Sequence, residues 1–511
     1  MSLADFKAGP WKKMHAAYVG SAFTMTPAPE YASSEVLLAS LYRTIGLEGV
    51  PEASVPQAGR DLERRLRAAK PAGSTVLSSD AWNLVVHWVL ESPKLPNQSS
   101  KRFLQMSPIV PEAARYSNSA RLAGSPWRPG HLVQRMVSLG CKDGESAGRL
   151  WERLYQSLQV TEEDDVWARW LEQEFLAWKP GPSTPFSFRP LGLEGDEGFP
   201  ALERESLHYP ARRFAIDLEA TIDAKGSMTR RQWTSMLEAL VRLASVSHVL
   251  WLCDVHYRAW RHLRDVLFDG KPPAAADAMR GIAFPRSPAY LAYGQAALRT
   301  VRSQAEAYLQ ARLGINLLLW SLEDIGAGEA TPLSSPSAFA RLAEAASRHR
   351  EPLLAAGLAD ALADLRDREA TTLSCSKKGI GSNIEEFARH ALGQRQTLNN
   401  VLKGYDQGYV LRKRGDYAGA PWVVSLGPVL LIALVHCCLH QGGGPRSVHW
   451  LCEHLASYGI AVDPKDIGAS DLGTNLRMLG LVLDSPDAES GMLMLPPFPR
   501  NTADKREGEW Q

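Results

Sequence analysis

The densest group of side chains that could bind a metal ion lies in residues 436–454, which read HCCLHQGGGPRSVHWLCEH. Four histidines and three cysteines fall within these nineteen positions. Cys437 and His440 are three positions apart. His449 and Cys452 have the same spacing on the other side of the GGGP turn. Because Zn²⁺ accepts a shell of two thiolates and two imidazoles, the spacing suggests a zinc site.

The same residues also fit the core between two packed helices. On a helical wheel Cys437 and Cys452 fall among apolar neighbours, and a buried cysteine behaves as a small hydrophobic side chain. Zinc modules place at least one ligand pair on a turn, whereas all four candidates here would lie inside helices. We therefore expect a helix pair, assign no metal ligand and no cofactor, and expect His436 and His454 at an edge or on the surface. The zinc alternative stays open.

A second candidate for metal chemistry is the segment RRFAIDLEATIDAKG, residues 212–226. Its Asp217 and Glu219 have the spacing of the Asp-x-Glu strand of DEDD exonucleases, which the segment resembles. In that family paired carboxylates hold metal ions that activate water. No glycine follows Thr221 and the family's other acidic motifs are not evident. The resemblance gives an alternative function, a divergent metal-dependent nuclease. The other interpretation is a helix entry whose acids face solvent.

No strong catalytic signature occurs elsewhere in the sequence. A nucleophile elbow, an HExxH motif, paired CxxC motifs and a dinucleotide-binding loop are all missing. Glu385 or Glu386 could act as an acid or base with His436 or His440, but no spacing rule supports that pairing. We therefore expect a non-catalytic protein and assign no catalytic residue.

Positive charge concentrates in residues 377–414, where eight lysines and arginines face three acidic residues, a local excess of +5. Tyrosines and side-chain amides are interleaved with them, a mixture that suits phosphate contact with stacking or amide readout. A solvated, salt-bridged surface is the alternative. The nucleic-acid-binding residues that we expect here are Lys377, Lys378, Arg395, Lys403, Tyr405, Arg412, Lys413 and Arg414.

The last part of the chain predicts three helices and a hairpin. VSLGPVLLIALVHCCLHQ, RSVHWLCEHLASYG and SDLGTNLRMLG read as helices, the second ended by Gly459 and the third by Gly480. The strands LVLD and MLMLPPF flank the turn-rich SPDAESG. This order over residues 422–498 resembles the winged-helix superfamily, with no specific family indicated. The resemblance implies a third helix in the DNA major groove and a hairpin beside the backbone.

Winged helices also serve as protein-docking modules, so the polar residues of the third helix matter. Those suited to contact bases or phosphates are Thr474, Asn475 and Arg477. The hairpin tip is acidic and would repel phosphate, through Asp484, Asp487 and Glu489. A wing that docks a protein, or that is purely structural, remains as the alternative.

Helices are the elements that must position these residues. Apolar residues recur every three to four positions through most of the chain, which predicts a mainly α-helical protein. Since 511 residues exceed one usual hydrophobic core, we expect several domains. They are a mostly helical N-terminal domain at 1–140, a helical hairpin at 141–178, a Pro/Gly-rich linker at 179–200, a central α-helical domain at 201–370, a basic helical segment at 371–421, the winged-helix-like domain at 422–498 and a charged tail at 499–511.

Two stretches show the helical spacing clearly. In the expected hairpin one face would carry Trp151, Leu154, Tyr155 and Leu158, and the next helix would repeat it with Val166, Trp167, Trp170 and Leu171. The segment TRRQWTSMLEALVRLAS reads as a long amphipathic helix with Trp233, Leu237, Leu240 and Val241 aligned.

Composition restricts the function class. The net charge of +1 excludes strong whole-molecule attraction to nucleic acid or anionic membrane, so binding must use a local patch. The six cysteines fit a reducing compartment, no signal pattern begins the chain, and residues 422–439 are interrupted by Gly427 and Pro428. We expect a cytoplasmic protein that does not cross a membrane, bacterial in composition.

These patterns favour a non-catalytic, DNA-associated or complex-forming subunit. Its expected partners are duplex DNA and other protein subunits. Besides the nuclease, the alternative is a scaffold of a multi-protein assembly, such as a bacterial genome-defence (antiviral) system.

Overall fold

The computed structural model describes most of the 511-residue chain. The described residues are 2–25, 34–47, 109–114, 129–177, 186–191, 209–283, 285, 289–328, 332–375, 379–391, 408–415, 417, 419–440, 445–484 and 492–498. The expected linker at 179–200 lies mostly outside them, and the expected charged tail at 499–511 lies wholly outside them. The prediction of a mainly α-helical protein is confirmed.

The N-terminal part consists of short and medium helices. They are α1 (Leu3–Ala8), α2 (Ala16–Val19), α3 (Ser34–Ile45), α6 (Pro111–Ala114), α7 (Pro129–Gly140), α8 (Gly144–Leu158) and α9 (Val166–Ala177). The central part contains α10 (Pro210–Asp223), the 3-10 helix η3 (Lys225–Ser227), α11 (Arg230–Asp269), α12 (Ala276–Ala283), β1 (Leu291–Ala292), α13 (Leu298–Asp324), α14 (Pro336–Arg348), α15 (Arg350–Ala355), α16 (Leu358–Arg368) and α17 (Ile380–Ala391).

The C-terminal part mixes helices with short strands. In chain order they are β2 (Tyr409–Lys413), β3 (Trp422–Leu426), α18 (Pro428–His440), β4 (Arg446–Ser447), α19 (His449–Ser457), β5 (Ile460–Ala461), the 3-10 helix η4 (Pro464–Ala469), α20 (Asp471–Met478), β6 (Val482–Asp484) and β7 (Met492–Met494). Gly459 and Gly480 follow α19 and α20 with φ of 75° and 66°, so the predicted helix ends are confirmed.

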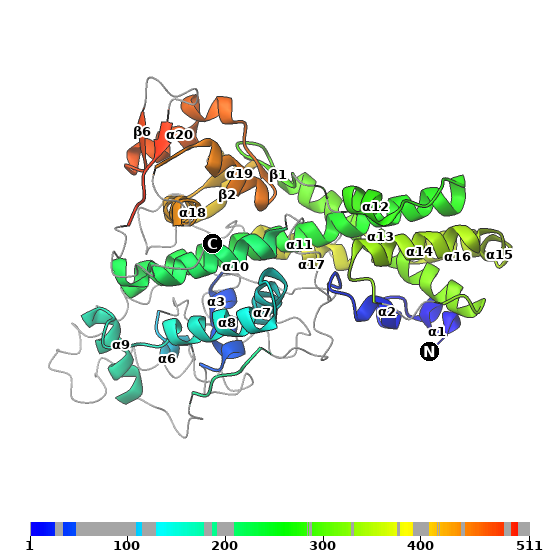
Figure 1. Ribbon diagram of the computed structural model, residues 1–511, viewed down its shortest axis with the longest axis horizontal. Coiled ribbons are helices and arrows are strands. Elements are labelled where there is room, and N and C mark those ends of the chain that lie inside the picture. Colours follow the sequence, from blue (N-terminus) through cyan, green and yellow to red (C-terminus); the bar gives the residue numbers. More distant parts are fainter. Residues whose placement is uncertain are drawn as a thin grey trace, which may run out of the picture.

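Helix α11 runs through the molecule as its longest element (Figure 1). A capping box between Thr229 and Gln232 begins it, and Gly270 in the left-handed region ends it. The sequence suggests an amphipathic helix, but the first half of α11 is buried on every side because helices cover it all round. Among the described residues α11 is the one helix long and apolar enough to cross a membrane, and its most apolar window is entirely inside the protein.

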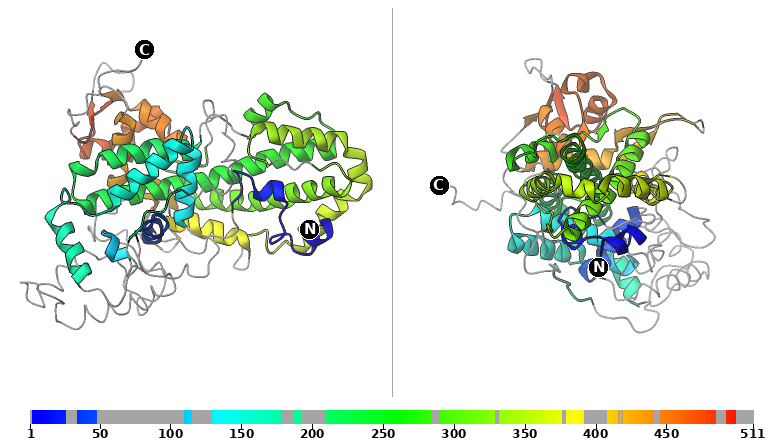
Figure 2. Two further views of the ribbon diagram at one scale, coloured as in Figure 1. Left: turned by 60° about the horizontal axis from the view of Figure 1, so that its bottom comes forward. Right: turned by 90° about the vertical axis from the view of Figure 1, so that its right-hand side faces the viewer.

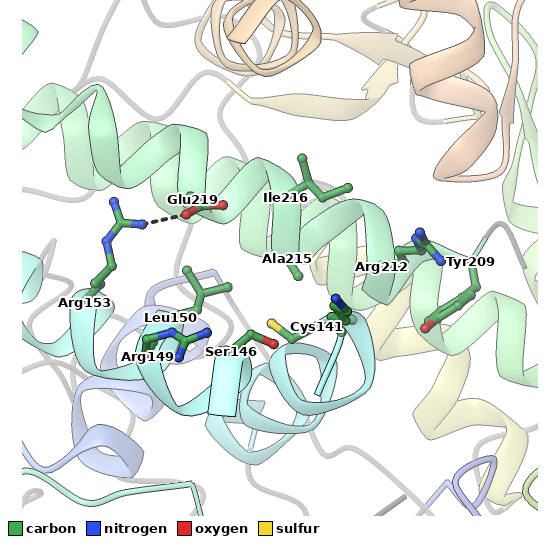
Figure 3. Close-up of a pocket in the computed structure, with 12 residues that line it drawn as sticks. Cys141, Ser146, Arg149, Leu150, Arg153, Tyr209, Arg212, Ala215, Ile216 and Glu219 are labelled. Carbon is green, nitrogen blue, oxygen red and sulfur yellow. Dashed lines mark hydrogen bonds and ion pairs between the residues drawn. The ribbon is translucent and has the colours of Figure 1, made fainter. Parts of the chain in front are cut away.

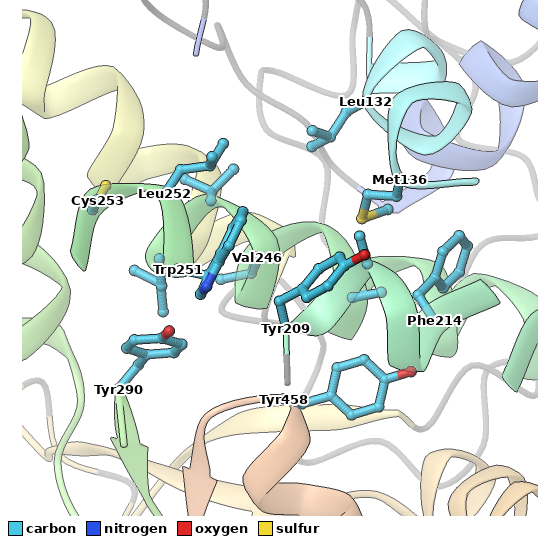
Figure 4. Close-up of a cluster of buried hydrophobic side chains, with 14 of the residues drawn as sticks. Leu132, Met136, Tyr209, Phe214, Val246, Trp251, Leu252, Cys253, Tyr290 and Tyr458 are labelled. Carbon is cyan, nitrogen blue, oxygen red and sulfur yellow. The ribbon is translucent and has the colours of Figure 1, made fainter. Parts of the chain in front are cut away.

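Helix α10 lies between two layers. It packs on α11, with α7 on one side and α18 on the other. Figures 1 and 2 show the C-terminal part on the side of α10 and α11 opposite to α3, α7 and α8. Tyr209 stands at the start of α10 and stacks on Trp251, and its neighbours include Met136 from one layer and Tyr458 from the other (Figure 4). The buried side chains form one connected core from Phe6 to Met494.

Two small sheets organise the C-terminal part. Strands β4, β7 and β6 form an antiparallel sheet in that order, so the predicted hairpin is present and β4 adds a third strand to it. Strand β5 pairs in parallel with β1, which precedes α13 and belongs to the central part. At this contact Gly459 lies so close to Tyr290 that an added Cβ would be 2.1 Å from the ring. These pairings tie the C-terminal part to the body.

Two sequence expectations change. Both helices of the expected hairpin at 141–178 form, but α9 packs on α6, and Val166 and Trp167 are exposed while Leu171 is buried. The expected basic helical segment at 371–421 is helical in α17 and then becomes β2, which pairs antiparallel with β3. The YVLRK and WVVSL segments are rich in β-branched and aromatic residues, which favour strands once they have a partner to pair with.

The contact between α11 and α13 gives a stability prediction. A Cβ at Gly314 of α13 would lie 2.1 Å from the Trp260 ring of α11. Gly314→Ala should therefore destabilise the protein by about 1–3 kcal/mol through overpacking. The control is Gly148→Ala in α8, where nothing lies within 4 Å of the added Cβ, and a gain of about 0.5–1 kcal/mol is expected. Urea unfolding measures the change in the free energy of unfolding of both variants. Equal changes in the two would contradict the close contact between α11 and α13.

Candidate nucleic-acid interface

The basic strand β2 and the start of α20 line the same cleft. It has a volume of about 710 Å³. Its walls include Arg412, Lys413 and Arg414 from β2 and its turn, and Ser470 and Asp471 from the first turn of α20. Residues 292–295, 415, 423–425, 461–463 and 467 complete it. The basic residues of β2 thus meet the start of α20 at one cleft, but the α20 candidates Thr474, Asn475 and Arg477 do not line it.

The cleft lining carries three cations and two carboxylates. Arg412 and Arg414 are exposed, and Lys413 is half-buried. In the part of the chain that the structure describes, none of the three pairs with a carboxylate, while the Arg412 guanidinium lies over the Tyr409 ring. The two carboxylates of the lining are Asp463 and Asp471. The other basic-segment candidates, Lys377, Lys378, Arg395, Lys403 and Tyr405, lie outside the described residues.

The backbone is strained where β2 begins. Tyr409 and Val410 have φ of 36° and 83°, and such values are costly for a β-branched residue. Val410 and Leu411 are buried, at 2% and 1% exposure, and Val410 is in register with Ser425 of β3. Burial and pairing hold the strained residues and so fix where the following arginines and lysine emerge.

Two of the candidate DNA-binding residues on α20 already make hydrogen bonds within the C-terminal part of the chain. The Thr474 hydroxyl donates to the Ser470 carbonyl at 3.2 Å. Nε of Arg477 donates to both carboxylate oxygens of Asp484 at 3.1 Å, and its Nη1 donates to the Gly468 carbonyl. Asn475 is half-buried. The outer face of α20 is thus open to solvent, but its one arginine is already paired with the hairpin.

Behind this part of the molecule lies a buried carboxylate, Asp217 of α10. Its side chain has no solvent exposure. One oxygen accepts from Nε and Nη2 of Arg213, at 2.8 and 2.6 Å. The other accepts from Nε2 of His454 and the hydroxyl of Tyr458, both at 2.7 Å. Asp217 with Arg213, His454 and Tyr458 is called the Asp217 cluster below, and it joins α10 to α19.

Opposing effects set the ionisation of Asp217. Burial alone raises the pKa of the carboxyl, but the charges and hydrogen bonds of His454 and Arg213 outweigh it and hold the pKa below its ordinary value. Burial likewise raises the pKa of Tyr458 well above its ordinary value, so its hydroxyl stays a donor to the carboxylate. The cluster is therefore an ionised carboxylate with donors from both partner elements.

Three of the four zinc candidates contact separate groups. The Cys437 thiol donates to the Asp217 carbonyl at 3.5 Å, and His440 pairs with Asp223 at 3.2 Å. His449 is exposed beside Glu453, and burial raises the pKa of Cys452 to about 12. Among the residues that the structure describes, no three His, Cys, Asp or Glu side chains are grouped so as to hold a metal ion. Cys437 and Cys452 are buried, as the expected helix pair requires.

Other expectations for these histidines and acids are corrected. His454 is buried at 4% exposure and bonded to Asp217, because α19 turns that side inward, so its expected surface position is wrong. His436 is half-buried and Nε2 donates to the Ala220 carbonyl at 3.0 Å, an edge position as expected. Glu385 pairs with Arg302 instead of either histidine.

The exonuclease interpretation of Asp217 and Glu219 is wrong. The segment is helix α10 and not a strand. Two positions apart on a helix, the carboxylates point in different directions, Asp217 into the Asp217 cluster and Glu219 to solvent, where it pairs with Arg153 at 2.7 Å. The expectation that both acids face solvent fails for Asp217 as well. The histidine and tyrosine that bind it are more than two hundred positions away, a pairing that no local spacing signals.

The Asp217 cluster predicts a large loss of stability on neutralisation. Asp217→Asn leaves Arg213 without its carboxylate and should lower the free energy of unfolding by about 3–5 kcal/mol. The control is Glu219→Gln on the same helix, whose ion pair is exposed and should contribute less than about 1 kcal/mol. Urea unfolding checks both, and a small effect at Asp217 would mean that the carboxylate is dispensable.

The same carboxylate predicts a pH dependence. Since folding lowers the pKa of Asp217, its contribution to stability is complete above the ordinary value of 3.8 and is lost as pH falls through the folded value. In that acid range the free energy of unfolding of the wild type should fall by up to about 1.4 kcal/mol per pH unit more than that of Asp217→Asn. Urea unfolding of the two proteins across a pH series gives the slopes, and parallel slopes would refute the linkage.

Comparison with known proteins gives no relative. No family model matches the sequence, and a search of the curated proteins finds no match. Any functional assignment therefore depends on the residues and their geometry.

Proposed function

We propose that this protein is a non-catalytic, DNA-associated subunit that contacts the sugar-phosphate backbone of duplex DNA. The contact surface is the cleft between the basic strand β2 and the start of α20. The observation that carries the proposal is that Arg412, Lys413 and Arg414 line this cleft together with Ser470 of α20. Phosphate contacts from such residues position a protein on DNA.

The order of elements supports a winged-helix-like domain over residues 422–498. Helix α18 is followed by β4, then by α19 and α20, and then by the hairpin of β6 and β7, with β7 central in the sheet. Helix α20 takes the place of the third helix, which in that superfamily enters the major groove. On its outer face Thr474, Arg477 and Met478 are exposed.

The charges favour backbone contact over base readout. Lys413 and Arg414 have no carboxylate partner among the described residues and can neutralise phosphates, with release of counterions. Arg477 is already paired with Asp484, and base contact would need that pair to open. Asp463 and Asp471, which also line the cleft, would repel a phosphate. We therefore propose weak, salt-dependent binding with little sequence preference.

A second role, contact with another protein subunit, has its own support. Met478 at the end of α20 is 80% exposed and Leu483 in β6 is 57% exposed. Exposed apolar side chains at these positions suit a protein surface better than a phosphate backbone. We propose that the protein works with other subunits in the bacterial cytoplasm, for which a genome-defence assembly is one setting. The nuclease alternative loses the two residues that suggested it and is not proposed.

DNA binding should depend on the basic strand. The double variant Lys413→Glu/Arg414→Glu should bind a duplex at least tenfold more weakly, because two phosphate contacts become repulsive. The slope of log Kd against log salt should fall by about 1.8, which corresponds to two lost contacts. Fluorescence anisotropy with duplexes of unrelated sequence measures both quantities.

The matched control is Arg261→Glu/Arg264→Glu, a double reversal at two exposed residues of α11 outside the cleft. It has the same change in net charge and should bind DNA as the wild type does. Equal losses of DNA affinity in the two double variants would show that the effect comes from the change in net charge and not from the cleft. Wild-type protein that binds no duplex at low salt would refute the proposed function and leave the protein-docking role.

A further inference from the structure

A second pocket lies on the other side of α10, between α8 and the start of that helix. Its volume is about 560 Å³, within the range of small-molecule sites. One wall is a single face of α8, with Ser146, Arg149, Leu150 and Arg153. The facing wall is a single face of α10, with Arg212, Ala215, Ile216 and Glu219. Figure 3 shows the two helices across the pocket, with Arg153 reaching from α8 to Glu219.

The pocket walls are strongly cationic. Four cations, Lys142, Arg149, Arg153 and Arg212, face one carboxylate, Glu219. Arg153 already neutralises Glu219 and also pairs with Asp223 at 2.6 Å. Two of the four cations remain to bind a ligand in the pocket.

Those two cations are Lys142 and Arg212. Neither side chain has a hydrogen-bond or ion-pair partner within the described residues, whereas Arg149 pairs with Glu145 outside the pocket. Arg212 is half-buried, where a guanidinium without a counter-ion loses hydration and gains nothing in return. An anion in the pocket would supply the missing partner. The guanidinium fork binds phosphate in two parallel hydrogen bonds.

The frame of the pocket is formed before any ligand binds. The Tyr209 hydroxyl donates to the Leu139 carbonyl at 2.8 Å and holds α10 to the end of α7. At Gly140 an added Cβ would lie 2.1 Å from the Ala211 carbonyl, so the two helices meet backbone to backbone. A capping box between Asp143 and Ser146 fixes the start of α8.

The pocket also has an apolar part. Leu150 and Ala215, at 7% and 5% exposure, lie between the cations, with Ile216 beside them. A ligand that fills the pocket thus needs a charged end and a flat or apolar body. From this geometry we propose that the pocket binds a mononucleotide, with its phosphates on Arg212 and Lys142 and its base against Leu150 and Ala215.

Isothermal titration calorimetry of the full chain with ADP, ATP, GTP and CTP tests the site, and pyrophosphate and adenosine separate its two parts. At least one nucleotide should bind with a micromolar to submillimolar Kd, and more tightly than either fragment. Arg212→Ala and Lys142→Ala should each weaken binding at least tenfold. Neither side chain makes a hydrogen bond or ion pair within the described residues, so the melting temperature should change little in these variants, while bound nucleotide should raise it in the wild type.

The control variants are Arg264→Ala, an exposed arginine of α11, and Lys413→Glu/Arg414→Glu in the DNA cleft, both of which should bind nucleotide normally. Failure of all four nucleotides at millimolar concentration overturns the proposal. So does unchanged affinity in Arg212→Ala and Lys142→Ala, or adenosine that binds as tightly as ADP. Loss of nucleotide binding in Lys413→Glu/Arg414→Glu would likewise overturn it and assign the ligand to the DNA cleft.

Discussion

The ionised carboxylate of Asp217, enclosed in the protein, is the constraint on which the C-terminal arrangement depends. An unpaired charge in this position would cost several kcal/mol, so the fold must bring donors to it. Arg213 comes from the same helix, but His454 lies in α19 and Tyr458 directly follows α19. Helix α19 can satisfy the carboxylate only in one orientation. The cluster thereby sets the rotation of the C-terminal part on α10.

That rotation has consequences at the surface. With the inner side of α19 fixed, β5 pairs with β1 from the central part, and Gly459 allows the backbone to approach Tyr290 closely. Strand β3 is bridged to Tyr293 and Ala296 from the same central segment. These contacts bring β2, β3 and the first turn of α20 to one cleft. The proposed DNA surface is thus a product of docking between two parts of the chain.

Helix α10 presents different residues on its two sides because of the helical repeat. The side chains of Arg213, Asp217 and Thr221 share the side that faces α18 and α19. Arg212 and Glu219 lie on the side that lines the pocket beside α8. One helix therefore divides a closed, neutralised cluster from an open, cationic pocket: Arg213 pairs with Asp217, whereas the adjacent Arg212 lines the pocket and has no partner within the described residues. Arg213, which is paired with Asp217, is structural, whereas Arg212 is available to a ligand.

The sequence by itself determined the mainly helical class, the helix ends at Gly459 and Gly480, the hairpin after α20 and the inward position of Cys437 and Cys452. These features follow from local periodicity, from backbone conformations that favour glycine, and from apolar neighbours a turn away. Only the tertiary structure decided that residues 409–413 form a strand, because a strand needs a partner to pair with. Only the tertiary structure made Asp217 a buried anchor, since the residues that neutralise it are remote in sequence and its burial comes from packing between layers.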